Sequence, residues 1–243
     1  MAQIKKKLKF IGRYVWEMVK GALPSTVMYM CAGMIMFMLI CRKGVEPKDL
    51  AWTTANKLWT AVCIVAAAAY NFLIGWANGG NHYEMLVSGN IKRSTADVYG
   101  NAYKISSHKV AKEYRVWKGF VFGALTAIFT VVFGIIFGCQ QAAIDKQLTV
   151  TALIGFLLSG WSLMPFYAMN ATANAGISYF LTCLLALIPI AVSGVSYIAG
   201  AYARRNKAIR AQELADKAAQ AEAQKAKKIN YGGLPGTKPK KRK

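Results

Sequence analysis

GFVFGALTAIFTVVFGIIFG, residues 119–138, contains no charged side chain and no histidine over its whole length. About 20 apolar residues in a helix span the hydrocarbon core of a bilayer, which is roughly 30 Å thick. A helix is the expected form, because backbone groups surrounded by lipid must find their hydrogen-bond partners within the segment. The stretch therefore predicts a transmembrane helix.

Further apolar segments lie on both sides of this helix, and the charged residues keep to their ends and to the loops. Hydrophobic residues make up 55% of the 243-residue chain and charged residues 17%, below the roughly 25% of a typical soluble domain. This segregation predicts an all-α fold, a polytopic membrane helix bundle with four clear spans and a fifth apolar segment broken by Pro189. The five segments are 24–41, 57–77, 119–138, 148–169 and 177–203.

Residues 1–23 form a basic segment before the first span. Apolar residues from Ile4 to Val19 recur at helical spacing among lysines and arginines, and Trp16 suits headgroup depth. This pattern predicts an amphipathic helix lying in the membrane interface. The alternative is a helical extension of the first span. Pro24 and Ser25 predict a break before that span.

The transmembrane domain is expected at 24–203, with a polar loop at 78–118 that contains two predicted breaks, at Gly79-Gly80 and at Gly100. The remaining 204–243 form a basic tail with thirteen Lys and Arg residues against three Asp and Glu. Its alanine-rich part predicts a helix, and the glycine- and proline-rich end predicts a disordered segment.

The distribution of Lys and Arg predicts the membrane orientation, because cytoplasmic loops concentrate these residues. Six precede the first span, four lie at 42–57, seven at 78–118, one at 139–147 and thirteen in the tail. The first four counts alternate as expected for a cytoplasmic N-terminus and a cytoplasmic loop 78–118. The thirteen cations of the tail predict that the tail is cytoplasmic as well. This requires 177–203 to re-enter rather than cross, or three short crossings within 148–203. Five full crossings with an exception to the charge rule remain the alternative.

The sequence predicts no enzymatic activity and no cofactor. Apart from Lys57 at the start of 57–77, the apolar spans contain no Asp, Glu, Lys, Arg or His, the residues that mark proton relays and ion paths in membranes. The five cysteines show no metal-binding spacing, and no nucleotide-binding or hydrolase motif occurs. His82 and Glu84 are the best candidates for an acid–base pair, but two residues apart on a helix they face different directions.

Small and neutral polar residues within the spans predict close helix packing. Two G-x-x-x-G patterns place Gly119, Gly123, Gly134 and Gly138 where helix backbones can approach one another. Asn71, Asn170 and Asn174 are the strongest candidates for hydrogen bonds between helices. In a channel or permease, the same amides would line a solute site.

Basic clusters outside the spans are the predicted contact residues for a partner. Anionic lipid attracts cations near the bilayer surface, and RNA attracts them without reading its sequence. The candidates are Lys5, Lys6, Lys7, Lys9, Lys92, Arg93, Lys238, Lys240, Lys241, Arg242 and Lys243.

These observations together predict a membrane protein without enzymatic activity. We expect a scaffold or accessory subunit that presents basic cytoplasmic surfaces to anionic lipid, to RNA or a ribosome, or to a protein complex. The glycine pairs also suit a homo-oligomer. The alternative is a small-solute channel or permease that uses neutral polar groups and the segment broken by Pro189.

Overall fold

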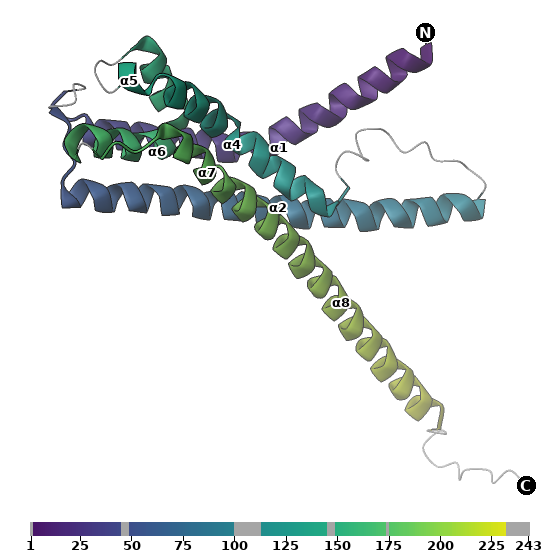
Figure 1. Ribbon diagram of the computed structural model, residues 1–243. Helices are drawn as coiled ribbons and strands as arrows, with labels where there is room; N and C mark the ends of the chain where they lie inside the picture. The colour runs from purple at the N-terminus through teal and green to yellow at the C-terminus, as the bar shows by residue number, and fades with distance from the viewer. Residues whose placement is uncertain (1, 45–48, 100–112, 145–148, 174, 232–243) are drawn as a thin grey trace, which may run out of the picture. The chain divides into compact units, whose positions relative to one another are not determined.

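The computed structural model describes residues 2–44, 49–99, 113–144, 149–173 and 175–231. These residues are helical nearly throughout, and no strand occurs among them. The chain divides into two compact units, Met1–Ala201 and Tyr202–Lys243. The elements are α1 (Ala2–Ile40), α2 (Thr54–Tyr99), α4 (Val116–Cys139), α5 (Gln141–Ile144), α6 (Val150–Ala173), η2 (Tyr179–Leu181), α7 (Thr182–Leu185) and α8 (Leu187–Tyr231), as Figure 1 shows.

The expected all-helical fold is confirmed, and five helices are long and apolar enough to cross a membrane. They lie in α1, α2, α4 and α6, and in the segment from η2 into α8. The candidate spans are Tyr14–Ile40, Thr54–Val87, Val116–Cys139, Val150–Ala173 and Tyr179–Lys225.

The break expected at Pro24 is wrong, because α1 is a single helix from Ala2 to Ile40 with Pro24 inside it. Proline removes one backbone donor and disfavours a helix interior. Packing on both sides of it offsets this cost, since Ala22 and Ser25 are buried against the rest of the bundle. The basic segment 1–23 is thus continuous in backbone with the first span.

The break expected at Gly79-Gly80 is also wrong, because α2 continues through both glycines to Tyr99. Glycine lowers helix propensity by about 1 kcal/mol relative to alanine, which makes a glycine pair look like a helix end in sequence. Gly79 instead lies against the backbone of Tyr197 in α8, where no side chain would fit. Tertiary packing therefore keeps the helix intact.

The fifth apolar segment follows one helical path. Ala186, between α7 and α8, has right-handed helical backbone angles (φ −59°, ψ −23°), and Pro189 lies in the first turn of α8. Pro189 does not interrupt α8, which is one helix from Leu187 to Tyr231. Five full crossings place the two chain ends on opposite sides of a membrane, so two cytoplasmic ends would require one segment not to cross.

The core of the first unit lies where α1, α4 and α6 meet. Gly33 of α1 and Gly160 of α6 face each other so closely that a Cβ on Gly33 would lie 2.8 Å from the Trp161 backbone nitrogen. Trp161 and Tyr167 are fully buried beside this contact. The largest group of buried hydrophobic residues surrounds it and extends to Phe137 and Tyr179.

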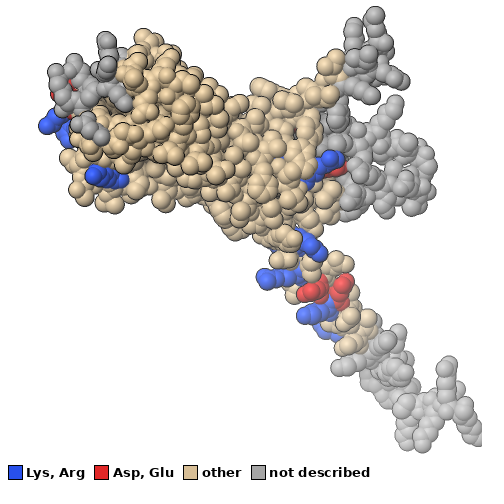
Figure 2. All heavy atoms as spheres, in the orientation of Figure 1, with Lys and Arg blue, Asp and Glu red and all other residues tan. Residues whose placement is uncertain are grey.

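The second unit continues α8 as a solvent-exposed helix, which we call the arm (residues 202–231). Every side chain described in it, from Tyr202 to Lys225, is exposed. Figure 2 shows Lys, Arg, Asp and Glu side chains along the arm, whereas the bundle surface in this view consists mainly of other residues. Six cations and three carboxylates lie between Tyr202 and Lys225.

Candidate functional site

None of the basic candidates has a side chain that the structure describes. The tail candidates from Lys238 to Lys243 and the amide candidate Asn174 fall outside the described residues. Lys5, Lys6, Lys7 and Lys9 lie in the first turns of α1, and Lys92 and Arg93 lie in α2. The structure describes the backbone of these six residues as helix but does not describe their side chains.

The four candidate glycines of α4 all lie against other segments of the chain. A Cβ on Gly123 would lie 2.5 Å from the Ile190 Cα, so α4 and α8 are in backbone contact there. Gly119 faces the Tyr197 side chain. Gly134 faces Thr182 and Cys183, and Gly138 faces the Phe180 ring. Both G-x-x-x-G patterns therefore contact η2, α7 and α8 within the chain.

A third G-x-x-x-G pattern, not among the sequence predictions, makes a close contact between α2 and α8. Gly75 and Gly79 of α2 lie against Ser196 and Tyr197 of α8, and Gly200 of α8 lies against the backbone of Trp76. The signal was present in GWANG, but Gly79-Gly80 reads as a helix break. Small residues on both helices allow this approach.

Asn71 joins α2 to the start of α8. Its side chain is buried, and Nδ2 donates a hydrogen bond to the Pro189 carbonyl oxygen over 3.2 Å. Asn170 acts locally instead: Nδ2 donates to the Ile177 carbonyl and Oδ1 accepts from the Ile177 N–H, both at 2.8 Å. Asn170 therefore holds the loop after α6 rather than linking two spans.

A hydroxyl cluster lies at a kink in α6. Ser159 has non-helical backbone angles (φ −135°, ψ 22°), as a Ser-Gly pair at a helix kink often does. The Ser159 Oγ lies 3.0 Å from the Ser162 Oγ and donates to the Thr130 Oγ1 of α4 over 3.3 Å. All three side chains are buried, so this cluster places neutral polar groups within the bundle.

An aromatic cluster lies around Tyr197, near the N-terminal end of α4. His82 Nδ1 lies 2.8 Å from the Tyr197 hydroxyl, and the Tyr114 ring stacks on the Tyr197 ring with 5.3 Å between centroids. Phe122 contacts both His82 and Tyr197 through its ring. Two segments distant in sequence, around His82 and around 114–122, thus meet at Tyr197.

Lys118 is fully buried beside this cluster. Its Nζ donates a hydrogen bond to the Glu113 carbonyl oxygen over 2.5 Å and lies 5.3 Å from the centre of the Tyr14 ring. A buried cation is costly unless it is paired, and the carbonyl and the ring face supply partners. The cluster ties the first turn of α4 to α1.

The two candidate acid–base residues lie in different surroundings. His82 is half buried and directed to Tyr197, whereas Glu84 is exposed. Among the described residues no group of His, Cys, Asp and Glu could hold a metal ion. Cys41 and Cys139 are free thiols, and burial raises the pKa of Cys41 to about 11.

Comparisons with protein-family models, with curated proteins and with solved structures find no match to this chain.

Proposed function

We propose that the protein is a non-enzymatic membrane scaffold or accessory subunit, and that its basic arm and tail are the surface on which it binds an anionic partner. The partner is anionic lipid near the bilayer, and RNA, a ribosome or a protein complex farther along the arm. The observation that carries this proposal is the complete exposure of Tyr202–Lys225 directly after a packed apolar segment.

The length and charge of the arm support this role. Residues 202–231 in a helix extend about 45 Å, several times the roughly 8 Å Debye length at physiological salt. Its distal part and the basic tail beyond it are therefore able to reach partners outside the field of the lipid charges. The excess of cations over carboxylates favours partners that carry phosphate groups.

The proposal requires the arm to be cytoplasmic, and it does not require the N-terminus to be there. With five full crossings, the segment before the first span (six cations) and the loop 78–118 (seven) lie on the N-terminal side of the membrane. The residues 42–57 (four cations), 139–147 (one) and the tail (thirteen) lie on the side of the arm. These totals are close, so charge alone sets the orientation weakly. Two cytoplasmic ends would need 177–203 to enter and leave on one side.

The side of the arm is tested first. One cysteine replaces Gln212 in the arm, or Gln3 near the N-terminus, in a chain otherwise free of cysteine. An impermeant maleimide is then added to intact cells. We expect Gln212→Cys to stay unlabelled until the cells are opened. Labelling of Gln212→Cys in intact cells would contradict the proposal.

The partner is tested with the full chain reconstituted in phosphatidylcholine vesicles, in vesicles that also contain phosphatidylglycerol, and with added ribosomes. We expect ribosome cosedimentation that weakens steeply with salt and is lost when the chain ends at Ala203. The matched control combines Glu213→Gln, Asp216→Asn and Glu222→Gln, which raises the positive charge of the arm and should strengthen binding. Binding that survives the truncation would contradict a role for the arm.

A second candidate, a small-solute permease, is favoured by the kink at Ser159. Transporter sites are often built from interrupted helices near the bilayer midplane, and Ser159, Ser162 and Thr130 place buried hydroxyls at such an interruption. Solute uptake by proteoliposomes, abolished by Ser159→Ala with Ser25→Ala as the control, would support it. Vesicles that remain impermeable to small neutral solutes would exclude it.

A further inference from the structure

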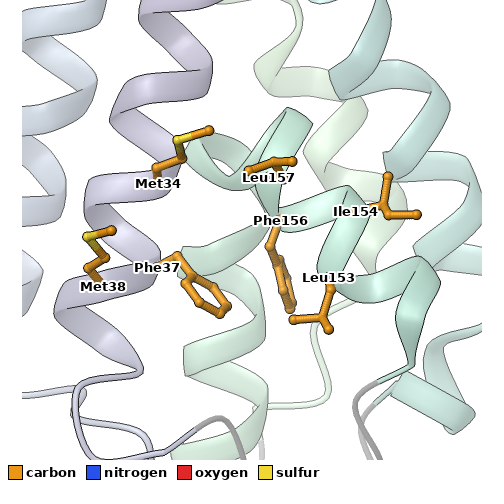
Figure 3. A pocket seen from close by; sticks show the side chains of 7 residues that line it. All are labelled: Met34, Phe37, Met38, Leu153, Ile154, Phe156 and Leu157. Atoms are coloured by element: carbon orange, nitrogen blue, oxygen red, sulfur yellow. The ribbon is translucent and has the colours of Figure 1, made fainter.

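A pocket of about 390 Å³ opens between α1 and α6, and its lining is hydrophobic. Its volume falls within the roughly 300–1,000 Å³ of typical ligand pockets. Phe156 is buried and its ring lies 6.1 Å from the Phe37 ring; Figure 3 shows these two rings side by side, one from each helix. The lining residues are Met34, Phe37, Met38, Leu153, Ile154, Phe156 and Leu157.

The rim of this pocket faces outward from the bundle. Met38 is 72% exposed, and Leu153, Ile154 and Leu157 are exposed as well. A concave apolar surface of this kind would favour association in water. Both helices are candidate membrane spans, however, so the molecules that meet the rim are lipid acyl chains.

The position of the pocket along the two helices gives its depth. Met38 lies two residues before α1 ends at Ile40, and Leu153 lies three residues after α6 begins at Val150. At about 1.5 Å per residue, the pocket begins roughly 3–5 Å from these helix ends. Met34 and Leu157 lie about 9–11 Å from them. This is the depth of the first part of an acyl chain below its headgroup.

Cations lie close in sequence to the end of α1 at which the pocket begins. Arg42 and Lys43 are exposed directly after α1, and the exposed Lys57 at the start of α2 has its Nζ 5.8 Å from the centre of the Trp52 ring. Asp49 on the same connection is half buried. Figure 2 shows Lys and Arg side chains at the end of the bundle where α1 leads into α2.

We propose that this pocket binds one acyl chain of an anionic phospholipid whose phosphate is held by Arg42 and Lys43. The apolar walls select a chain rather than a polar solute, and the two cations select a negative headgroup. The site lies in the first unit and does not depend on the arm. The test of this lipid site can therefore succeed or fail independently of the test of the proposed function.

The test is native mass spectrometry of the full chain in detergent with added phosphatidylglycerol or phosphatidylcholine. We expect one phosphatidylglycerol retained per chain, with retention about 25-fold stronger than for phosphatidylcholine, since each cation near an anionic headgroup contributes about fivefold. Arg42→Gln combined with Lys43→Gln should bring the two lipids to near parity. Leu157→Trp, which fills the pocket, should weaken retention of both lipids at least tenfold.

Two further variants keep the test decisive. Leu73→Trp adds the same ring to an exposed site on α2 outside the pocket, and it should leave retention unchanged. Met38→Trp fills the pocket from the opposite wall and replaces Leu157→Trp if that chain does not fold. Unchanged retention in both pocket variants, or equal retention of the two lipids by the unaltered chain, would overturn the proposal. A dimer that Leu157→Trp dissociates would also overturn it, because a second copy would then occupy the pocket.

Discussion

The Tyr197 hydroxyl of α8 lies 2.8 Å from His82 Nδ1 of α2, a contact between residues 115 positions apart. Tyr197 is fully buried, and Tyr114 and Phe122 pack on its ring. One side chain thereby connects the last span to the second span and to the start of the third.

Tyr197→Phe should separate the hydrogen bond from the packing. The phenylalanine keeps the ring contacts, so we expect a loss of about 1 kcal/mol in the free energy of unfolding. Tyr197→Ala also leaves a cavity and should cost about 3–5 kcal/mol. Unfolding by sodium dodecyl sulfate in mixed micelles measures both. Equal losses for the two variants would show that the hydroxyl, and not the ring, provides the stability.

Gly79→Ala should disturb the crossing of α2 and α8. The added methyl group meets the Tyr197 backbone, which cannot move as a side chain can, so we expect a loss of about 1–3 kcal/mol. Gly12→Ala in α1 is the control, because a Cβ there meets no atom within 4 Å. A stabilised Gly79→Ala protein in the same denaturation measurement would contradict the close approach.

Asn71→Leu should remove the hydrogen bond to the Pro189 carbonyl while keeping a side chain of similar size. Hydrogen bonds between helices in membranes contribute about 0.6 kcal/mol on average and up to about 1.7, so we expect a loss in that range. Asn81→Leu, at an exposed position of the same helix, should change the unfolding free energy little. Equal effects of the two substitutions would argue against the Asn71 contact.

Cys41 should react slowly with maleimide at neutral pH. With a pKa of about 11 caused by burial, about one thiol in ten thousand is thiolate at pH 7, and the thiolate is the reactive form. The labelling rate should rise about tenfold per pH unit up to about pH 11. The exposed Cys139 serves as the internal reference, with mass spectrometry of each peptide as the measurement. Labelling of Cys41 as fast as Cys139 at pH 7 would contradict its burial.

Helix ends were the least predictable part of the fold. Pro24 and Gly79-Gly80 are strong local break signals, yet α1 and α2 continue through both. Proline or glycine within a helix costs about 1–3 kcal/mol locally. This cost is smaller than the free energy that a helix gains by packing its buried face. The kink at Ser159 was missed for the converse reason, since the surrounding apolar pattern is unbroken.

The sequence by itself determined that this chain is helical and has segments suited to a membrane, because apolar segments of about 20 residues are long enough to span lipid and must pair their backbone groups internally. The tertiary structure alone decided which of the small and polar residues meet. Gly79 with Tyr197 and Asn71 with Pro189 are pairs more than a hundred residues apart. Segments of similar hydrophobicity can pack in many arrangements, and only the complementary shapes of their surfaces select one.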